Sequence, residues 1–418
     1  MTNIYERTIY NDLEYLGYKI NMQYQGEGQI TYPSGKIKIG IFINSILQGP
    51  NGQIIFPDGQ INCGTFINNK LYGYGLVKLP SGQIIEGLFN NSNLQGSVDI
   101  IINENVIKTG TLIDNQLQGY GTINYSGTIF TGIFRDNILQ GQGKITYQNG
   151  QISSGIFENE LLQGSGKVVF PSGQKNIGKF INNILQGNGQ IIFPNINNKD
   201  IIIYNGNFNF GKLYGPGSIT YSNKTKKIGI FKNDVLKGKG QIIVIDKISK
   251  KEIIYDGIFN NNKLQGKGTI TYPDGTIKIG SFTNNILQGE GQIIVIDKIS
   301  NNKIIYDGIF DNDKLNGFGK ITNNNTIKIG TFHDDLLQGE GYVIYKNGAK
   351  QVGTFNNNIL QGDGHMIFID TNTQKNIICY CTFNNDKLDG AFRSIDQDGK
   401  IKLGIFENNK IKTVGLWH

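Results

Sequence analysis

The chain has few of the residues from which catalytic, metal and disulfide sites are built. Its 418 residues include only 3 histidines and 3 cysteines. His333, His365 and His418 show no spacing to Ser, Asp or Cys that predicts a catalytic constellation. Cys379 and Cys381 have no second pair beside them, whereas a structural zinc site needs four ligands. We therefore expect no enzymatic activity, no catalytic residue, no cofactor and no metal site.

The cysteine pattern also speaks against a disulfide framework. Cys63 is far from the other two, and Cys379 and Cys381 would point to the same side of one strand, where a bond between them would be strained. Free thiols are typical of a reducing compartment. The N-terminus lacks the apolar segment of a secretory signal, and no apolar stretch reaches the ~20 residues of a membrane span. We expect a cytoplasmic protein without a transmembrane segment.

Charge and proline are scarce, whereas glycine is abundant. Charged residues make up 17% of the chain, and the net charge is +7. A nucleic-acid-binding protein would cluster Lys and Arg on one face or in one run, and no such run exists, so we expect no nucleic-acid partner. The chain has 8 Pro but 57 Gly, together with 20 Tyr and 23 Phe. This combination predicts tight turns between short strands.

One motif recurs along nearly the whole chain. Gly257-Ile258-Phe259 opens a unit, and Gly280-Ser281-Phe282 opens the next, 280 − 257 = 23 residues later. A fixed period of this size indicates a solenoid or array of repeats. Spacings of 22 to 24 residues, or 28 where a loop is longer, give about sixteen units. The opening positions are Gly17, Gly40, Gly64, Gly87, Gly110, Gly132, Gly155, Gly178, Gly206, Gly229, Gly257, Gly280, Gly308, Gly330, Gly353 and Gly404, with Cys381 in the slot between the last two.

Each unit is predicted to be a β-hairpin. Its first strand carries Gly-x-Phe, and its second begins with Leu-Gln-Gly-x-Gly and ends in a turn sequence such as Pro273-Asp274-Gly275. Three residues after the Phe the chain places Asn or Asp, as at Asn262. Both tolerate the left-handed region, so the slot predicts a positive φ. Gly211 occupies the slot once, and Glu160 is the clearest exception, which predicts a strained or altered turn.

This pattern resembles the MORN repeat, the membrane occupation and recognition nexus motif. Tyr255-Asp256-Gly257-Ile258-Phe259 matches the first half of that motif, and Leu264-Gln265-Gly266-Lys267-Gly268 matches the second. Phe stands where the family has Trp, and Asn or Asp mostly replaces its first turn Gly. The resemblance implies a scaffolding role in cilia and flagella, including radial spokes, and in other cytoskeletal structures.

Hairpins laid side by side predict an all-β fold, an elongated, twisted single antiparallel sheet that forms a rod over residues 17–403. Residues 1–16 are expected to form an N-terminal cap. A short helix is predicted over residues 3–16, where Tyr5, Ile9, Leu13 and Leu16 have helical spacing; a partner-binding arm is the alternative. Residues 404–418 are expected to complete the last strand pairing, with Trp417 packing at the cap or contacting a partner.

A stripe of Lys and Tyr is the surface feature with a functional interpretation. It occupies the position two residues before the opening Gly, at Tyr204, Lys227, Tyr255, Lys278, Tyr306, Lys328 and Lys402. On a regular stack these residues share a face. Either the Lys stems lie over the Tyr rings while the ammonium groups reach water, or the stripe docks an acidic polymer or an anionic lipid.

Three functions follow from this reading. The preferred one is a non-enzymatic scaffold that binds other proteins of a large cytoskeletal assembly, with the ciliary axoneme favoured. The alternative is a peripheral membrane protein that binds phosphoinositides through the stripe. The third, which the resemblance also implies, is the targeting arm of an enzyme on a separate chain. Longer hairpins near residues 246–252 and 297–303 make the paired region 206–403 the expected docking side.

Overall fold

The computed structural model is all-β. It describes residues 5–103, 106–194, 201–297, 301–369 and 374–417, and these residues form 35 strands and no helix. Consecutive strands pair antiparallel, and a two-residue turn such as Asn261-Asn262 joins the strands of one hairpin. The predicted fold class, an antiparallel sheet of stacked β-hairpins, is therefore confirmed.

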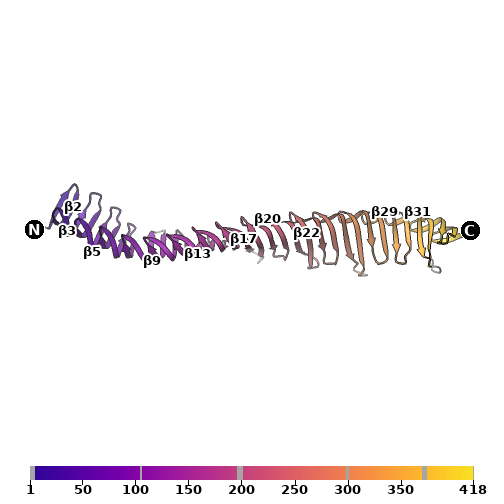
Figure 1. Ribbon diagram of the computed structural model, residues 1–418, viewed down its shortest axis with the longest axis horizontal. Helices are drawn as coiled ribbons and strands as arrows, with labels where there is room; N and C mark the ends of the chain where they lie inside the picture. The colour runs from indigo at the N-terminus through magenta and orange to yellow at the C-terminus, as the bar shows by residue number, and fades with distance from the viewer. Residues whose placement is uncertain (1–4, 104–105, 195–200, 298–300, 370–373, 418) are drawn as a thin grey trace. The chain divides into compact units, whose positions relative to one another are not determined.

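The chain divides into two compact units, residues 1–199 with 208–211, and residues 200–207 with 212–418. Within each unit the strands lie side by side in chain order (Figure 1). The first unit contains β1 (Tyr5–Tyr10), β2 (Leu13–Ile20), β3 (Gln23–Thr31), β4 (Ile37–Ile43), β5 (Ile46–Ile55), β6 (Ile61–Ile67), β7 (Lys70–Lys78), β8 (Ile84–Asn90), β9 (Asn93–Asn103), β10 (Val106–Ile113), β11 (Gln116–Tyr125), β12 (Thr128–Arg135), β13 (Ile138–Thr146), β14 (Ile152–Glu158), β15 (Leu161–Val169), β16 (Lys175–Ile181) and β17 (Ile184–Pro194).

Strand β18 (Ile201–Asn209) contributes residues to both units. The second unit also contains β19 (Lys212–Thr220), β20 (Lys226–Lys232), β21 (Val235–Ile245), β22 (Glu252–Asn260), β23 (Lys263–Thr271), β24 (Ile277–Thr283), β25 (Ile286–Ile296), β26 (Lys303–Asp311), β27 (Lys314–Thr322), β28 (Thr326–His333), β29 (Leu336–Tyr345), β30 (Lys350–Asn356), β31 (Ile359–Ile369), β32 (Asn376–Asn384), β33 (Lys387–Ile395), β34 (Ile401–Glu407) and β35 (Lys410–Trp417).

The first described residues form a hairpin and not a helix. Strand β1 pairs with β2 from Tyr5 opposite Tyr18 to Tyr10 opposite Leu13. The helix predicted over residues 3–16 is therefore wrong for residues 5–16, and residues 3 and 4 lie outside the described part. Asn11 and Asp12 adopt φ values of 46° and 60°. Two successive positive φ angles make a hairpin turn, which interrupts any helix regardless of apolar spacing.

The repeated glycines allow the two strands of a hairpin to approach closely. Gly257 of β22 lies opposite Gly268 of β23, and the register shifts between Gly257 and Phe259. A Cβ on Gly257, whose φ is 146°, would lie 2.5 Å from the carbonyl oxygen of Lys267 and 2.6 Å from the Cα of Gly268. The Leu-Gln-Gly-x-Gly segment thus forms a β-bulge, which bends the strand and places Leu264 opposite Phe259.

The two faces of the sheet differ in burial. On one face, here called the inner face, Phe259, Leu264 and Ile270 are at most 1% exposed. On the other, the outer face, Ile258 is 45% exposed. Burying one such Phe, Leu or Ile side chain contributes about 1.5–3 kcal/mol. The inner face therefore supplies the core, although the sheet is the only layer of secondary structure that the described residues form.

Both residues of the hairpin turn adopt positive φ angles. Asn261 has a φ of 49° and Asn262 a φ of 62°, as a type I′ turn requires. The predicted positive φ at Asn262 is confirmed, and the position before it, which was not predicted, shares it. Asn159 and Glu160 have φ values of 49° and 63°. The turn at Glu160 therefore keeps the ordinary conformation, and this side chain carries the strain.

The longer hairpin expected near residues 246–252 is present. Strands β21 and β22 end and begin on either side of it, and the Asp246 N–H donates to the Lys251 carbonyl at 2.8 Å. Asp246 Oδ2 accepts from the Ser249 N–H at 2.7 Å. The matching loop predicted near residues 297–303 includes residues 298–300, which lie outside the described residues.

The expected final strand pairing is also present. Strand β34 pairs antiparallel with β35, whose Trp417 lies opposite Ile401 in the register. His418 lies outside the described residues.

Candidate interaction surface

Most of the predicted stripe lies in one register row of the inner face. The row runs through Lys227, Ile242, Tyr255, Ile270, Lys278, Ile293, Tyr306, Ile321, Lys328, Val343, Gln351, Met366, Cys379, Ser394 and Lys402, each opposite the next. The structure thus brings the Lys and Tyr residues of the stripe onto one face and alternates them mostly with aliphatic side chains. Tyr204 is half-buried on β18.

The ammonium groups of this row are bound inside the array. Lys278 Nζ is 3.0 Å from Asp313 Oδ1, and the Lys278 side chain is only 15% exposed. In other units the lysine reaches the turn Asn of the next unit, at 2.9 Å in Lys38–Asn69, 2.8 Å in Lys108–Asn137, and 3.0 Å in both Lys227–Asn262 and Lys328–Asn358. These ammonium groups therefore already have acceptors within the array. Lys402 is exposed.

Each of these bound ammonium groups has an acceptor oxygen on the next turn, and in some units it also lies over an aromatic ring. We call such a site, formed by a ring and an oxygen around the ammonium group, a lysine seat. Lys278 Nζ lies 5.4 Å from the centroid of Tyr272, and Lys227 Nζ lies 5.3 Å from that of Tyr221. These distances are within the range of cation–π attraction. Each ring belongs to the residue that directly follows the second strand of the preceding hairpin, and not to the stripe tyrosines that the sequence suggested.

The stripe tyrosines are half-buried rungs of the inner face. Burial raises the pKa of Tyr204, Tyr255 and Tyr306, and the nearby Asp335 carboxylate raises that of Tyr306 further. Burial also lowers the pKa of Lys328, an effect that Asp386 partly offsets. These three tyrosines are therefore neutral at physiological pH.

The turn residues bind the hairpin that precedes them. The Asn285 N–H donates to the Leu264 carbonyl at 3.1 Å, and Asn285 Oδ1 accepts from the Leu264 N–H at 2.6 Å. We call this pair of bonds the turn clamp. It recurs at Asn69, Asn115, Asn137, Asn183, Asp234, Asn262, Asp313, Asp335, Asn358, Asp386 and Asn409.

The sequence had assigned this slot to backbone conformation alone. Gly would satisfy the positive φ equally well, yet it occupies the slot at Gly211 while Asn or Asp fills most others. This preference for Asn and Asp over Gly indicates that the slot needs a side-chain hydrogen-bond acceptor.

The outer face exposes apolar side chains at equivalent positions. In the first unit Tyr74, 68% exposed, lies opposite Leu88, 57% exposed. Tyr120, 74% exposed, lies opposite Ile133, 46% exposed. These residues occupy the variable positions of Gly-x-Gly and Gly-x-Phe. None of them was predicted from the sequence, although they recur beside the Gly and Phe positions of the repeat.

Comparison with known families agrees with this architecture. The model of the MORN repeat matches residues 130–152, 177–195, 255–277, 306–325 and 329–350. The chain is a MORN-repeat protein. The five MORN matches fall inside the hairpin array, and the paired strands continue the same register beyond them. No curated protein matches the chain. The described residues contain no helix that could cross a bilayer.

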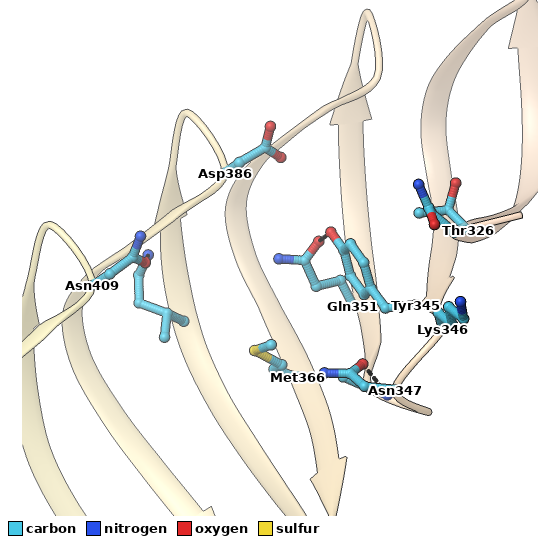
Figure 2. A pocket seen from close by; sticks show the side chains of 11 residues that line it. Thr326, Tyr345, Lys346, Asn347, Gln351, Met366, Asp386 and Asn409 are labelled. Atoms are coloured by element: carbon cyan, nitrogen blue, oxygen red, sulfur yellow. Dashed lines mark hydrogen bonds between the residues drawn. The ribbon is translucent and has the colours of Figure 1, made fainter. Parts of the chain in front are cut away.

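Near the C-terminal end of the second unit, the MORN array contains a cavity of about 810 Å³. Tyr345, Gln351 and Met366 line it together with the turn residues Asp386 and Asn409 (Figure 2). The Tyr345 hydroxyl donates to Gln351 Oε1. Gln351 and Met366 continue the register row of the stripe, so the cavity lies on the inner face.

The cysteines and histidines form no reactive cluster in the part of the MORN array that the structure describes. Cys379 and Cys381 are 4% and 6% exposed, and the Cys381 thiol donates to the Cys379 carbonyl at 3.4 Å. A hydrogen bond with the side chain of Cys379, together with burial, raises the pKa of Cys381. The His333 side chain is 70% exposed, whereas His365 lies 5.5 Å from the Tyr380 ring. No group of three His, Cys, Asp or Glu among these residues could hold a metal ion.

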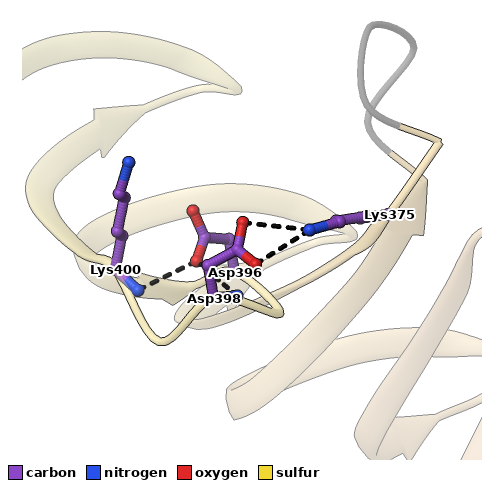
Figure 3. A network of polar contacts seen from close by, with 4 residues as sticks. All are labelled: Lys375, Asp396, Asp398 and Lys400. Carbon is purple, nitrogen blue, oxygen red and sulfur yellow. Dashed lines mark hydrogen bonds and ion pairs between the residues drawn. The ribbon is translucent and has the colours of Figure 1, made fainter.

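A polar network joins neighbouring hairpin ends at the surface (Figure 3). Lys375 Nζ lies 2.8 Å and 3.1 Å from the two carboxylate oxygens of Asp398. Asp396 Oδ1 accepts from the backbone N–H groups of Asp398 and Lys400. The hydrogen bond raises the pKa of Lys375 and lowers that of Asp398. The Lys375 and Asp398 side chains are 45% and 59% exposed, so this network is a solvent-exposed ion pair that connects two loops.

Proposed function

We propose that this MORN-repeat protein is a non-enzymatic scaffold whose outer face binds partner proteins of a cytoskeletal assembly in the cytoplasm. The observation that supports the proposal is the recurrence of exposed apolar pairs, Tyr74 with Leu88 and Tyr120 with Ile133, on one face. Exposed apolar patches of this kind mark interaction surfaces in soluble proteins. The ciliary axoneme is the first assembly to test.

A repeated surface suits a scaffold for energetic reasons. Aromatic residues are enriched in protein interfaces, and an exposed Tyr beside an aliphatic side chain offers both an apolar contact and a hydroxyl group. When several equivalent sites on one chain engage one assembly, each later contact forms at a high effective concentration. Modest individual contacts then add up to firm retention.

The inner-face stripe gives less support to docking on an anionic membrane. The ammonium groups of Lys227, Lys278 and Lys328 already have acceptors within the array. An external phosphate would have to compete with those bonds and reach side chains that are partly buried.

The proposal is tested by co-sedimentation with detergent-washed axonemes. The variant Tyr74→Ser/Leu88→Ser/Tyr120→Ser/Ile133→Ser should reduce pelleting at least about tenfold, because interface aromatics often carry more than 1 kcal/mol each. The control variant Met22→Ser/Phe210→Asn/Ile248→Ser removes exposed apolar side chains from turns and should pellet like the unmodified protein. The three control residues are 92%, 75% and 92% exposed.

The outcomes separate the alternatives. Equal pelleting of the outer-face variant and the control would refute the outer face as the docking surface. Complete release by mild detergent, together with flotation on phosphoinositide-containing vesicles, would favour the membrane alternative. Flotation that persists after Lys227→Glu, Lys278→Glu and Lys328→Glu would exclude the stripe as its cause.

A further inference from the structure

Each complete lysine seat of the inner face is built from three residues. Around Lys278 these are the lysine itself, the Tyr272 ring six residues before it, and the Asp313 carboxylate on the next turn. Around Lys227 they are Tyr221 and Asn262, and around Lys38 they are Tyr32 and Asn69. The chain thus binds an alkylammonium group repeatedly with one aromatic ring and one side-chain oxygen.

At Gln351 the aromatic ring and a carboxylate oxygen are present without a lysine. Gln351 stands two residues before Gly353, as Lys278 stands two before Gly280, and Tyr345 stands six residues before Gln351. Asp386 takes the place of Asp313, and its Oδ1 accepts the Leu360 N–H at 2.6 Å in the usual turn clamp. With the residues that the structure describes, Asp386 forms no ion pair within 4.0 Å.

The cavity of about 810 Å³ lies where the lysine side chain would run. Figure 2 shows Gln351 and Tyr345 between Asp386 and Met366. The Tyr345 hydroxyl is hydrogen-bonded to the amide oxygen of Gln351. Gln351 is too short to reach Asp386 as lysine does, and its amide oxygen is held by Tyr345. Ala349 adds little volume to the wall. Pockets of this size commonly hold small ligands or a single side chain.

Asp386 is exposed, and its charge attracts Lys328, but the two form no ion pair within 4.0 Å among the described residues. Lys346 lines the cavity but is exposed, so its ammonium group is solvated. Lys328 Nζ donates to Asn358 Oδ1 at 3.0 Å. Lys328 therefore holds the equivalent position of the preceding unit and already has an acceptor oxygen there.

We propose that this cavity binds a primary alkylammonium group, with the ammonium at the Asp386 carboxylate and the stem along Tyr345 and Met366. Two sources share this chemistry, a lysine side chain of a partner protein and a free polyamine. The site lies on the inner face and does not depend on the outer-face docking proposed above. Either proposal can fail while the other holds.

The binding test uses the full chain and three probes, n-butylammonium, Nα-acetyl-lysine amide and spermidine, followed by NMR or calorimetry. We expect saturable binding with a dissociation constant of about 1 mM or tighter for at least one probe. The neutral isostere of n-butylammonium, n-butanol, should bind at least about tenfold more weakly, because a charge-assisted bond is lost. Preference for acetyl-lysine amide indicates a protein lysine, and preference for spermidine indicates a polyamine.

Two variants locate the site. Asp386→Ser removes the carboxylate but keeps the turn clamp, since Ser92 Oγ accepts the Leu71 N–H at 2.9 Å in the same way. It should weaken binding at least about tenfold. Gln351→Lys should abolish binding by supplying an internal ammonium, and it should raise the melting temperature.

A third variant tests the logic in reverse. Lys278→Gln removes the ammonium from a complete seat, and it should create a second site of the same kind at Asp313 and Tyr272. The measured stoichiometry should then double. Absence of saturable binding of all three probes up to roughly 10 mM, or binding that Asp386→Ser and Gln351→Lys leave unchanged, overturns the proposal.

Discussion

The Nζ atom of Lys278 and the Oδ1 atom of Asp313 lie 3.0 Å apart, and the same oxygen accepts the Leu287 N–H at 2.9 Å. Lys278 and Leu287 belong to the two strands of one hairpin, whereas Asp313 lies on the turn of the next. One carboxylate therefore joins both strands of a hairpin to its neighbour. The turn contributes to the stability of the unit before it as well as to its own.

Removal of this carboxylate should loosen the preceding hairpin. We expect Asp313→Ala to cost about 2–4 kcal/mol locally, because it leaves the Leu287 N–H and the partly buried Lys278 without their acceptor. Asp313→Asn should cost less than about 1 kcal/mol, since Asn262 makes both contacts elsewhere. Hydrogen exchange at the Leu287 amide measures the effect on this unit alone. Equal loss of protection in both variants would contradict this account.

The strained turn at Glu160 should be improvable. Its φ of 63° is energetically costly for Glu. Glu160 makes the backbone bond of the turn clamp, in which its N–H donates to the Leu139 carbonyl at 3.1 Å. Glu160→Asn should stabilise the region by about 1–2 kcal/mol, because Asn tolerates this conformation and adds an acceptor for the Leu139 N–H. Glu160→Gly relieves only the backbone and should give a smaller gain. Amide exchange at Leu139 distinguishes the two, and a larger gain with Gly would argue against the acceptor.

Inner and outer residues of one strand should respond differently to truncation. Phe259 is 1% exposed and Ile258 is 45% exposed. We expect Phe259→Ala to cost about 3–5 kcal/mol in local stability through lost burial and a cavity. Ile258→Ala should change stability by about 0.5 kcal/mol or less. Exchange protection across β22 and β23 provides the measurement, and a comparable loss in both variants would mean that the outer face is also part of the core.

Tyr15 should make stability fall in alkaline solution. It is fully buried, and burial together with Tyr24 raises its pKa from 10.0 to about 12. Between these values the unfolded chain has lost the proton that the folded chain keeps, so stability is full below pH 10 and declines as the pH rises toward 12. Tyr15→Phe should remove one phenolate that forms near pH 12 in an ultraviolet titration. Loss of a phenolate that forms near pH 10 would contradict the assignment.

The fold was predictable because its main constraints are local. Each period repeats the Gly and Phe seen at Gly257 and Phe259, which indicates a hairpin unit. The slot that Asn262 occupies holds Asn in some units and Asp in others, which indicates a left-handed turn. The apolar spacing of residues 5–16 fits a helix and a strand pair equally well, and only the two-residue turn at Asn11 and Asp12 decides between them.

The lysine seats were less predictable because their partners come from another unit. Nothing in the spacing of Lys278 indicates that a carboxylate on the next turn will reach it. That contact depends on the bend that the β-bulge puts into each hairpin. The sequence does show Gln351 in a lysine slot, but the cavity beside it also requires the side chains of Ala349 and Met366.

The turn clamp gives the array a polarity. Asn285 bonds back to Leu264, and Asn262 bonds back to Leu236, so each hairpin is secured by its successor. A damaged turn therefore weakens the hairpin upstream of it and spares the clamp on the hairpin downstream. Point lesions and proteolytic nicks should accordingly propagate loosening in one direction, toward lower residue numbers. Two lesions of equal severity will differ in consequence according to what lies on their N-terminal side.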